Sequence, residues 1–391
     1  MIRVSIIGIV GLPANYGGFE SFVEQLVRRI SNDILLTVYC SAGSYTERQQ
    51  EYFGARLKYL PLRANGWQSI FYDGAAMLDA LRDSDVIFVL GVSGSVWFPL
   101  VRMLSDILGR KLIVHLDGLE WKRSKWGNIS RSFLRFSESI AVKFAHIPVT
   151  DNKAVAQYIS DRYRRFPEVI EYGGDHVLQV QSPERCENSG IDLFDKYAVA
   201  VSRAEPENNV ELILEAFKNL PEHNLVYVSN WKHSRWSREL KEKYKDVPNI
   251  KMIGPIYDQR VLNCIRSRAS VYVHGHSVGG TNPSLVEAMW LGLPVIAYDV
   301  PFNRCVTENA ALYFSTREGL VQIVKTLDKE CLCQNAARML QIAKRRFTWD
   351  RIVTEYEKLF NGIQKVDDSK LGTMPRHKRK SDAQRDNPHT K

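Results

Sequence analysis

Two glycine-containing segments of this 391-residue chain precede helical patterns, and each could bind an anion or a sugar. In the first, GLPANYGGFE, apolar residues recur at helical spacing from residue 19 to residue 30, which predicts a helix that begins at Gly17 or Gly18. Backbone amides at the positive end of such a helix suit a phosphate or a sugar, and a tight turn without a ligand is the alternative. The candidate residues of this loop are Asn15, Tyr16, Gly17 and Gly18. Their spacing is not GxGxxG, which counts against a nicotinamide-binding domain.

The second segment, VYVHGHSVGGTNPSLVEAMWLGLPVIAYD, spans residues 271–299. It predicts a strand, a glycine loop and then a helix with Pro283 in its first position, where the missing amide is no loss. The exposed amides of the loop and the first helical turn would form an anion site. The candidate residues are Gly279, Gly280, Thr281 and Asn282, the last as the helix cap.

Glu287 is an acid on this short and otherwise apolar helix, between Val286 and Ala288. Burial of an unpaired carboxylate is expensive, so Glu287 needs partners. Ribose hydroxyls beside a bound diphosphate would serve, and a solvent-facing glutamate is the alternative.

Other candidate side chains follow predicted strands. Arg203, in AVSRAEPENN, offers fixed donors for phosphate, although a surface ion pair is the usual role of a lone arginine. Carboxylates at strand ends could orient sugar hydroxyls or act as a base, and each could instead cap a helix. We therefore take Asp117 and Asp151 as catalytic candidates, and His115 and Glu120 as candidates for binding a sugar beside them.

The elements that must position these residues form two series in which Val- and Ile-rich runs alternate with helical patterns. The first series runs from IRVSIIGIV to HIPVT and the second from YAVAVSR to ALYF. We predict an α/β protein with two Rossmann-like, doubly wound domains that face each other across a ligand-binding cleft. The expected units are residues 1–180, residues 181–345, a helix at 346–362 that packs back on the first domain, and a disordered basic tail at 363–391.

Charge is concentrated in two places. The chain has 53 Lys and Arg against 44 Asp and Glu, a net of +9, and 45% apolar residues, which excludes disorder throughout. The tail 363–391 and the segment 120–136 each contribute +4, so the remainder is nearly neutral. Net charge alone allows a nucleic-acid-binding protein, but that alternative does not explain two strand series with glycine loops, and we expect no nucleic-acid partner.

The segment 120–136 interleaves its cations with Trp121, Trp126, Phe133 and Phe136, which favours contact with an anionic membrane; a solvated helical face is the alternative. The longest uncharged stretch, 86–101, has 16 residues and is interrupted by glycine and proline, whereas a membrane span needs about 20. With no secretory signal pattern at the N-terminus, we expect a cytoplasmic protein held peripherally at the inner face of the cell membrane.

Several of these segments together resemble the GT-B glycosyltransferases of family 4, and more narrowly a bacterial rhamnosyltransferase-like branch, over residues 1–360. The segments are GLPANYGGFESFVEQL, DGLEWKRSKW, EYGGD, EPENN and HGHSVGGTNPSLVEAMWLGLPVIA. The resemblance implies that Glu287 holds the donor ribose, that the amides of Gly280 and Thr281 bind the diphosphate, and that Arg203 binds phosphate.

Two positions depart from the wider family. Gly279 stands where a glutamate contacts the donor sugar, and Asn208 stands where a lysine binds the diphosphate. The narrow branch implies retaining transfer of L-rhamnose from dTDP-L-rhamnose onto a polyprenyl-diphosphate-linked sugar, in capsule or cell-wall polysaccharide synthesis. A UDP-hexose donor and a nucleotide-sugar epimerase are the alternatives. We expect no metal and no cofactor.

Overall fold

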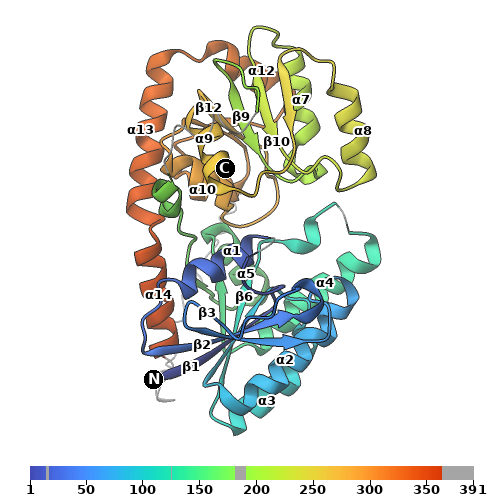
Figure 1. The fold of residues 1–391 in the computed structure, drawn as a ribbon, viewed down its shortest axis with the longest axis vertical. Coiled ribbons are helices and arrows are strands. Elements are labelled where there is room, and N and C mark those ends of the chain that lie inside the picture. The colour runs from blue at the N-terminus through green and yellow to red at the C-terminus, as the bar shows by residue number, and fades with distance from the viewer. Residues whose placement is uncertain (15–16, 125, 181–190, 363–391) are drawn as a thin grey trace, which may run out of the picture.

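The computed structural model describes residues 1–14, 17–124, 126–180 and 191–362, which form two α/β domains (Figure 1). The first domain holds an eight-stranded sheet in the order β3-β4-β2-β1-β5-β6-β7-β8, parallel except where β3 meets β4. Its strands are β1 (Ile2–Ile7), β2 (Ile34–Ser41), β3 (Glu51–Tyr52), β4 (Ala55–Leu60), β5 (Val86–Leu90), β6 (Lys111–Leu116), β7 (Ile147–Thr150) and β8 (Glu168–Val169).

The second domain holds a six-stranded sheet, parallel throughout, in the order β11-β10-β9-β12-β13-β14. Its strands are β9 (Ala198–Val201), β10 (Leu225–Val228), β11 (Ile250–Ile253), β12 (Val271–His274), β13 (Val295–Tyr298) and β14 (Leu312–Phe314). Strands covered by helices on both faces are continuous apolar runs, which is why the Val- and Ile-rich segments located them. Both predicted strand series, and the α/β class, are confirmed.

Helices pack on the faces of both sheets. The first domain has α1 (Gly18–Val27), α2 (Ser69–Asp83), α3 (Phe98–Ile107), α4 (Asn128–Phe144) and α5 (Lys153–Tyr163). The second has α7 (Val210–Lys218), α8 (Arg235–Tyr244), α9 (Gln259–Ser267), α10 (Pro283–Trp290), α11 (Pro301–Val306), α12 (Arg317–Thr326) and α13 (Lys329–Arg346). The start of α1 at Gly18 and the place of Pro283 at the start of α10 are as predicted.

The last helix, α14 (Trp349–Gly362), continues from α13 but packs on the first domain, as the red end of the ribbon shows (Figure 1). Its buried face, which includes Trp349, Tyr356 and Phe360, belongs to the same core as Val4, and α14 contacts α1 and β1. The chain therefore crosses between the domains twice, once after β8 and once between α13 and α14.

Some predicted features lie outside the described residues: Asn15 and Tyr16 of the first loop, the start of the second predicted domain at 181–190, and the tail 363–391. Within the described ranges, no helix is both long and apolar enough to cross a membrane.

Candidate functional site

The candidate site lies where loops that follow strands of both sheets touch each other. Gly118, two residues beyond β6, packs against the loop beyond β12: a Cβ atom on Gly118 would lie 2.4 Å from the carbonyl carbon of Gly279. Ser124 donates a hydrogen bond to the carboxylate of Glu207, which belongs to the second domain. The two predicted strand-end clusters are therefore brought together.

Two helix N-termini converge at this contact. Gly18, the first residue of α1, lies next to Pro283, the first residue of α10, since a Cβ on Gly18 would be 3.9 Å from the Pro283 ring. Both helices direct their positive ends at the same region, which favours an anion there. In the first loop, Glu20 and Glu24 accept hydrogen bonds from the amides of Val10 (3.0 Å) and Ala14 (2.9 Å), so α1 itself holds the glycine segment in place.

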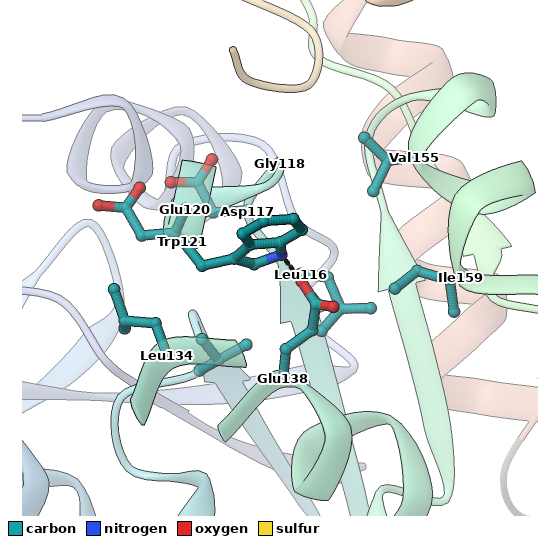
Figure 2. A pocket seen from close by; sticks show the side chains of 10 residues that line it. Leu116, Asp117, Gly118, Glu120, Trp121, Leu134, Glu138, Val155 and Ile159 are labelled. Carbon is teal, nitrogen blue, oxygen red and sulfur yellow. Dashed lines mark hydrogen bonds between the residues drawn. The ribbon is translucent and has the colours of Figure 1, made fainter. Parts of the chain in front are cut away.

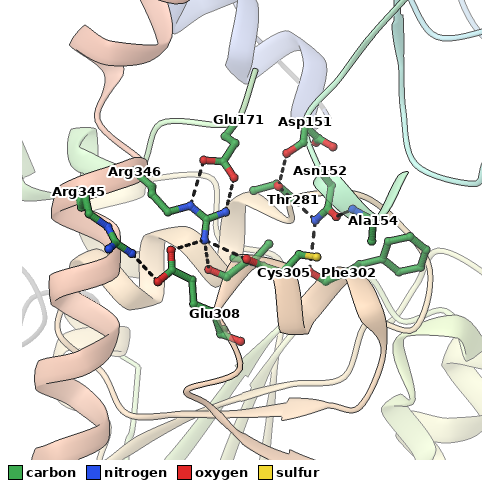
Figure 3. A network of polar contacts seen from close by, with 12 residues as sticks. Asp151, Asn152, Ala154, Glu171, Thr281, Phe302, Cys305, Glu308, Arg345 and Arg346 are labelled. Carbon is green, nitrogen blue, oxygen red and sulfur yellow. Dashed lines mark hydrogen bonds and ion pairs between the residues drawn. The ribbon is translucent and has the colours of Figure 1, made fainter. Parts of the chain in front are cut away.

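Asp151, which follows β7, contacts the predicted anion loop directly. The Thr281 hydroxyl donates to the Asp151 carbonyl (2.6 Å), as Figure 3 shows, and the Thr281 amide also bonds the Asp151 carboxyl. Burial first, and then the charge of Asp117 at the end of the neighbouring strand, raise the pKa of Asp151 to about 8. One carboxyl oxygen, Oδ1, is buried without a hydrogen-bond partner. At neutral pH Asp151 is therefore mostly protonated, and it is able to donate a hydrogen bond to a phosphate oxygen.

Arg123 lies among carboxylates from both domains. Its guanidinium is 2.6 Å from Glu120 and 3.6 Å from Asp117, and its side chain is 14% exposed. Burial lowers the pKa of Arg123, but Asp117, Glu120, Glu207 and Glu205 outweigh it and raise the pKa overall. This arginine, which the sequence placed in a basic surface segment, is instead part of the candidate site.

The aromatic residues next to Arg123 also turn inward. Trp121 donates its indole N–H to Glu138 (3.1 Å) beneath Asp117 and Glu120, and it lines a cavity of about 10 Å³ (Figure 2). Trp126 donates to Glu120 (3.2 Å). Trp121 and Trp126 of this segment therefore have partners inside the protein, whereas Phe136 is 59% exposed.

Glu287 is buried on α10, and its partners are protein groups. Arg266 of α9 donates to Oε2 (2.6 Å), and Nε2 of His176 lies 3.3 Å from Oε1. Burial acts to raise the pKa of Glu287, but Arg266 and His176 outweigh it and lower the pKa to about 2. Glu287 is thus an ionised carboxylate, and each of its oxygens has a second lone pair that can accept a hydroxyl.

Arg203 is exposed at the end of β9, where phosphate could reach it. Asn208 donates to the carbonyl of Arg203 (2.9 Å), so it shapes the turn that presents this arginine. Burial, together with His274, Arg203 and Arg123, lowers the pKa of His276 well below its usual range, so a neutral imidazole lies near both arginines.

Two other predicted residues have structural explanations. His115 is 4% exposed among the rings of Phe19, Phe22 and Phe88, and burial lowers its pKa to about 3. It is a neutral core histidine and is not brought to the cleft surface. Gly279 has φ +142°, a backbone conformation that side chains rarely adopt, which explains glycine at this position. Asn282 is the N-cap residue of α10, but its side chain makes no capping hydrogen bond.

Sequence reasoning missed Arg123, Arg266 and His176. Arg266 follows Leu262 by four residues, on a buried helix face, and a cation on such a face signals a buried anion partner. His176 directly follows the EYGGD segment. For Arg123 the sequence has no comparable signal.

Comparison with family models divides the chain at the same place as the fold. Residues 1–175 match a domain of unknown function, DUF1972, and residues 182–340 match glycosyl transferases group 1. A glycosyltransferase 1 domain-containing protein from Xenopus tropicalis is 27% identical over 135 residues, which are 33% of this chain and 38% of that protein.

Solved structures share the fold over most of the chain. Sucrose-phosphate synthase from Thermosynechococcus elongatus superposes with a TM-score of 0.79 at 15% identity, covering 93% of this chain and 99% of that one. Anabaena HepE in complex with UDP gives 0.71 at 17% identity, over 93% and 100%. The catalytic domain of Arabidopsis thaliana starch synthase IV, bound to ADP and acarbose, gives 0.67 at 13% identity, over 93% and 99%. The architecture is the GT-B fold, as predicted.

Proposed function

We propose that this chain, a GT-B glycosyltransferase whose second domain belongs to the glycosyl transferases group 1 family, transfers L-rhamnose with retention from dTDP-L-rhamnose to a polyprenyl-diphosphate-linked sugar. The observation that carries the proposal is the ionised Glu287, held on α10 one turn beyond the loop of Gly280 and Thr281 at the contact between the domains. A buried anion beside an anion-binding loop suits a nucleoside diphosphate, whose ribose hydroxyls donate and whose phosphates accept.

In this proposal catalysis consists of placement and of stabilising the departing diphosphate. Arg203, the positive ends of α1 and α10, and the protonated Asp151 would face the phosphates, while Arg123 would balance the cleft carboxylates. The leaving diphosphate would help to deprotonate the acceptor hydroxyl, with Asp117 close by. No step requires a metal or a cofactor.

The test is turnover of purified dTDP-L-rhamnose with a polyprenyl-diphosphate-linked acceptor. Glu287→Ala should remove most of the activity, because ribose loses its anion partner and Arg266 loses its counter-ion. Glu239→Ala, an exposed glutamate on α8, is the control and should be as active as the wild type. Undiminished turnover by Glu287→Ala, or loss of wild-type activity on addition of a chelator, would contradict the mechanism.

A UDP-hexose donor is the second candidate, because HepE, a structural neighbour, has been solved with UDP-glucose. A thermal-shift screen of dTDP- and UDP-sugars should rank dTDP-L-rhamnose first. Product analysis with donor alone separates transfer from epimerisation: a transferase yields slow hydrolysis at most, whereas an epimerase yields an altered sugar nucleotide.

We also propose that the chain works at an anionic membrane in the cytoplasm. The support is a set of exposed apolar side chains on α3 and α4, two helices in contact with each other. Its exposed side chains are Leu100, Met103, Ile107, Ile129 and Phe136. Arg135 is exposed beside Phe136 and adds a cation, worth about 1 kcal/mol near an anionic surface.

Liposome co-sedimentation tests this surface. The paired substitution Met103→Asp and Ile107→Asp should reduce binding to anionic vesicles, whereas Tyr257→Asp, at an exposed aromatic of the second domain, should not. Equal binding of the wild type to neutral and anionic vesicles would remove the electrostatic part of the proposal.

A further inference from the structure

His176 lies between the proposed ribose carboxylate and the helix that returns to the first domain. Its Nε2 is 3.3 Å from Oε1 of Glu287, and its Nδ1 accepts a hydrogen bond from the indole N–H of Trp349 (3.0 Å). Trp349 is the first residue of α14 and is fully buried in the core of the first domain. One imidazole therefore joins the second domain's proposed donor site to the first domain's core.

The hydrogen bonds settle which nitrogen of His176 carries the proton. An indole N–H can only donate, so Nδ1 of His176 must present a lone pair. The proton of the neutral ring then lies on Nε2, where it donates to Glu287. The contact with Glu287 is thus a hydrogen bond from a neutral imidazole, and Trp349 selects the tautomer that makes it possible.

Trp349 is itself held by the residues just before His176. Asp175 accepts from the Trp349 backbone amide (2.8 Å), and the Tyr172 ring packs edge-on against the indole, with ring centres 5.0 Å apart. Gly173 allows this approach, because a Cβ there would lie 2.5 Å from the indole. The position of Trp349, and with it the His176 tautomer, depends on how α14 is seated.

The same segment also touches α10. A Cβ on Gly174 would lie 2.6 Å from the Val286 side chain, and the Gly174 amide donates to the carbonyl of Phe347 (2.8 Å), which also accepts from the Trp290 indole (2.9 Å). The segment from Tyr172 to His176 is thus packed between α10 and the junction of α13 with α14. The segment that carries His176 therefore contacts α10, the helix that carries Glu287.

We infer that His176 is a positioning residue that orients Glu287 for a nucleoside diphosphate, and that Trp349 fixes its tautomer so that donor binding depends on the seating of α14. This inference rests on the proposed function, because it takes Glu287 as the nucleotide-binding carboxylate. It extends that function by making the interdomain helix junction part of the donor site.

The experiment measures affinity of the full-length protein for dTDP and for UDP by calorimetry. Loss of one hydrogen bond to a charged group corresponds to about a tenfold weaker affinity, which we expect for His176→Ala. His176→Gln keeps an N–H close to the place of Nε2 and should retain affinity to within about threefold. His146→Ala is the matched control, since His146 also accepts through Nδ1 (from the Leu112 amide, 2.9 Å) and pairs through Nε2 with a carboxylate (Asp106, 2.8 Å).

A second measurement separates positioning from simple loss of structure. In ¹⁵N NMR of the imidazoles, wild-type His176 should show a protonated Nε2 and an unprotonated Nδ1. Trp349→Phe should shift the Nδ1 signal, because Nδ1 loses its indole donor while the ring stays packed. Trp349→Phe should also weaken dTDP and UDP binding, by less than His176→Ala does.

The outcomes discriminate between the two proposals. If Glu287→Ala binds dTDP and UDP as the wild type does, the proposed donor site is wrong. If Glu287→Ala loses binding but His176→Ala binds like His146→Ala, the positioning role alone is wrong. An unchanged Nδ1 signal of His176 in Trp349→Phe would overturn the role of the tryptophan.

Discussion

Replacement of Asp151 by asparagine should change how the stability of the protein depends on pH. An unfolded aspartate has a pKa of 3.8, whereas burial and the charge of Asp117 raise the pKa of Asp151 to about 8. Between these values the folded state holds a proton that the unfolded state has released, so stability falls as pH rises from about 4 to about 8. Each pH unit in this window costs about 1.4 kcal/mol, which amounts to up to ~4 kcal/mol at pH 7.

Asparagine has the shape of the protonated acid and can still accept from the Thr281 amide, but it does not ionise. Asp151→Asn should therefore match the wild type near pH 4 and exceed its stability by a growing margin toward pH 8. Between pH 5 and pH 7 the difference should grow by up to about 2.7 kcal/mol.

The assay is urea unfolding followed by tryptophan fluorescence at pH 5 and pH 7. The exposed Asp33→Asn is the control and should keep the pH dependence of the wild type. Parallel behaviour of Asp151→Asn and the wild type would show that Asp151 is ionised in the fold, and it would remove the argument that a neutral Asp151 faces the phosphates.

Two further substitutions test the domain contact and the buried ion pair. Gly118→Ala would place a Cβ 2.4 Å from Gly279 and should lower turnover by at least about tenfold, because small misplacements in active sites are costly. The control, Gly127→Ala, has no atom near its Cβ and should be as active as the wild type. Equal rates for the two variants would show that the contact between Gly118 and Gly279 is not needed. Arg266→Met should destabilise the protein by about 3–5 kcal/mol in urea unfolding, because it leaves Glu287 as a buried charge without its cation. Adding Glu287→Met to that variant should restore most of the loss, and failure to do so would mean that packing, not charge, is the function of Arg266.

Local sequence patterns were enough to predict where most of the strands and the first helix lie. Apolar runs located the strands of both series, and the spacing after Gly17 located the start of α1. The two-residue strands β3 and β8 were not predicted, because a segment that short contains no periodicity to detect. Helical periodicity alone does not show where the stretch from Glu318 to Phe360 divides into α12, α13 and α14.

Identity and spacing also indicated that Asp117 and Asp151 follow strands whose ends could meet. These two carboxylates do lie close to each other, because Leu116 pairs with Thr150 across β6 and β7, so the residues that follow lie side by side. β6 and β7 are neighbours in the strand order of the sheet. Sequence periodicity gives no information about strand order, so this contact could not be predicted.

The α/β class, the two strand series and the position of the glycine loop before α10 could all be predicted from the sequence, because they follow from the residue periodicity and the turn residues of short segments. The partners come from the tertiary fold: Arg266 and His176 for Glu287, the Thr281 amide for Asp151, and Glu207 of the second domain for Arg123. Each of these pairs joins residues at least 21 positions apart, up to 130 for Asp151 and Thr281. Such contacts depend on how sheets and helices pack, and packing is a property of the whole chain.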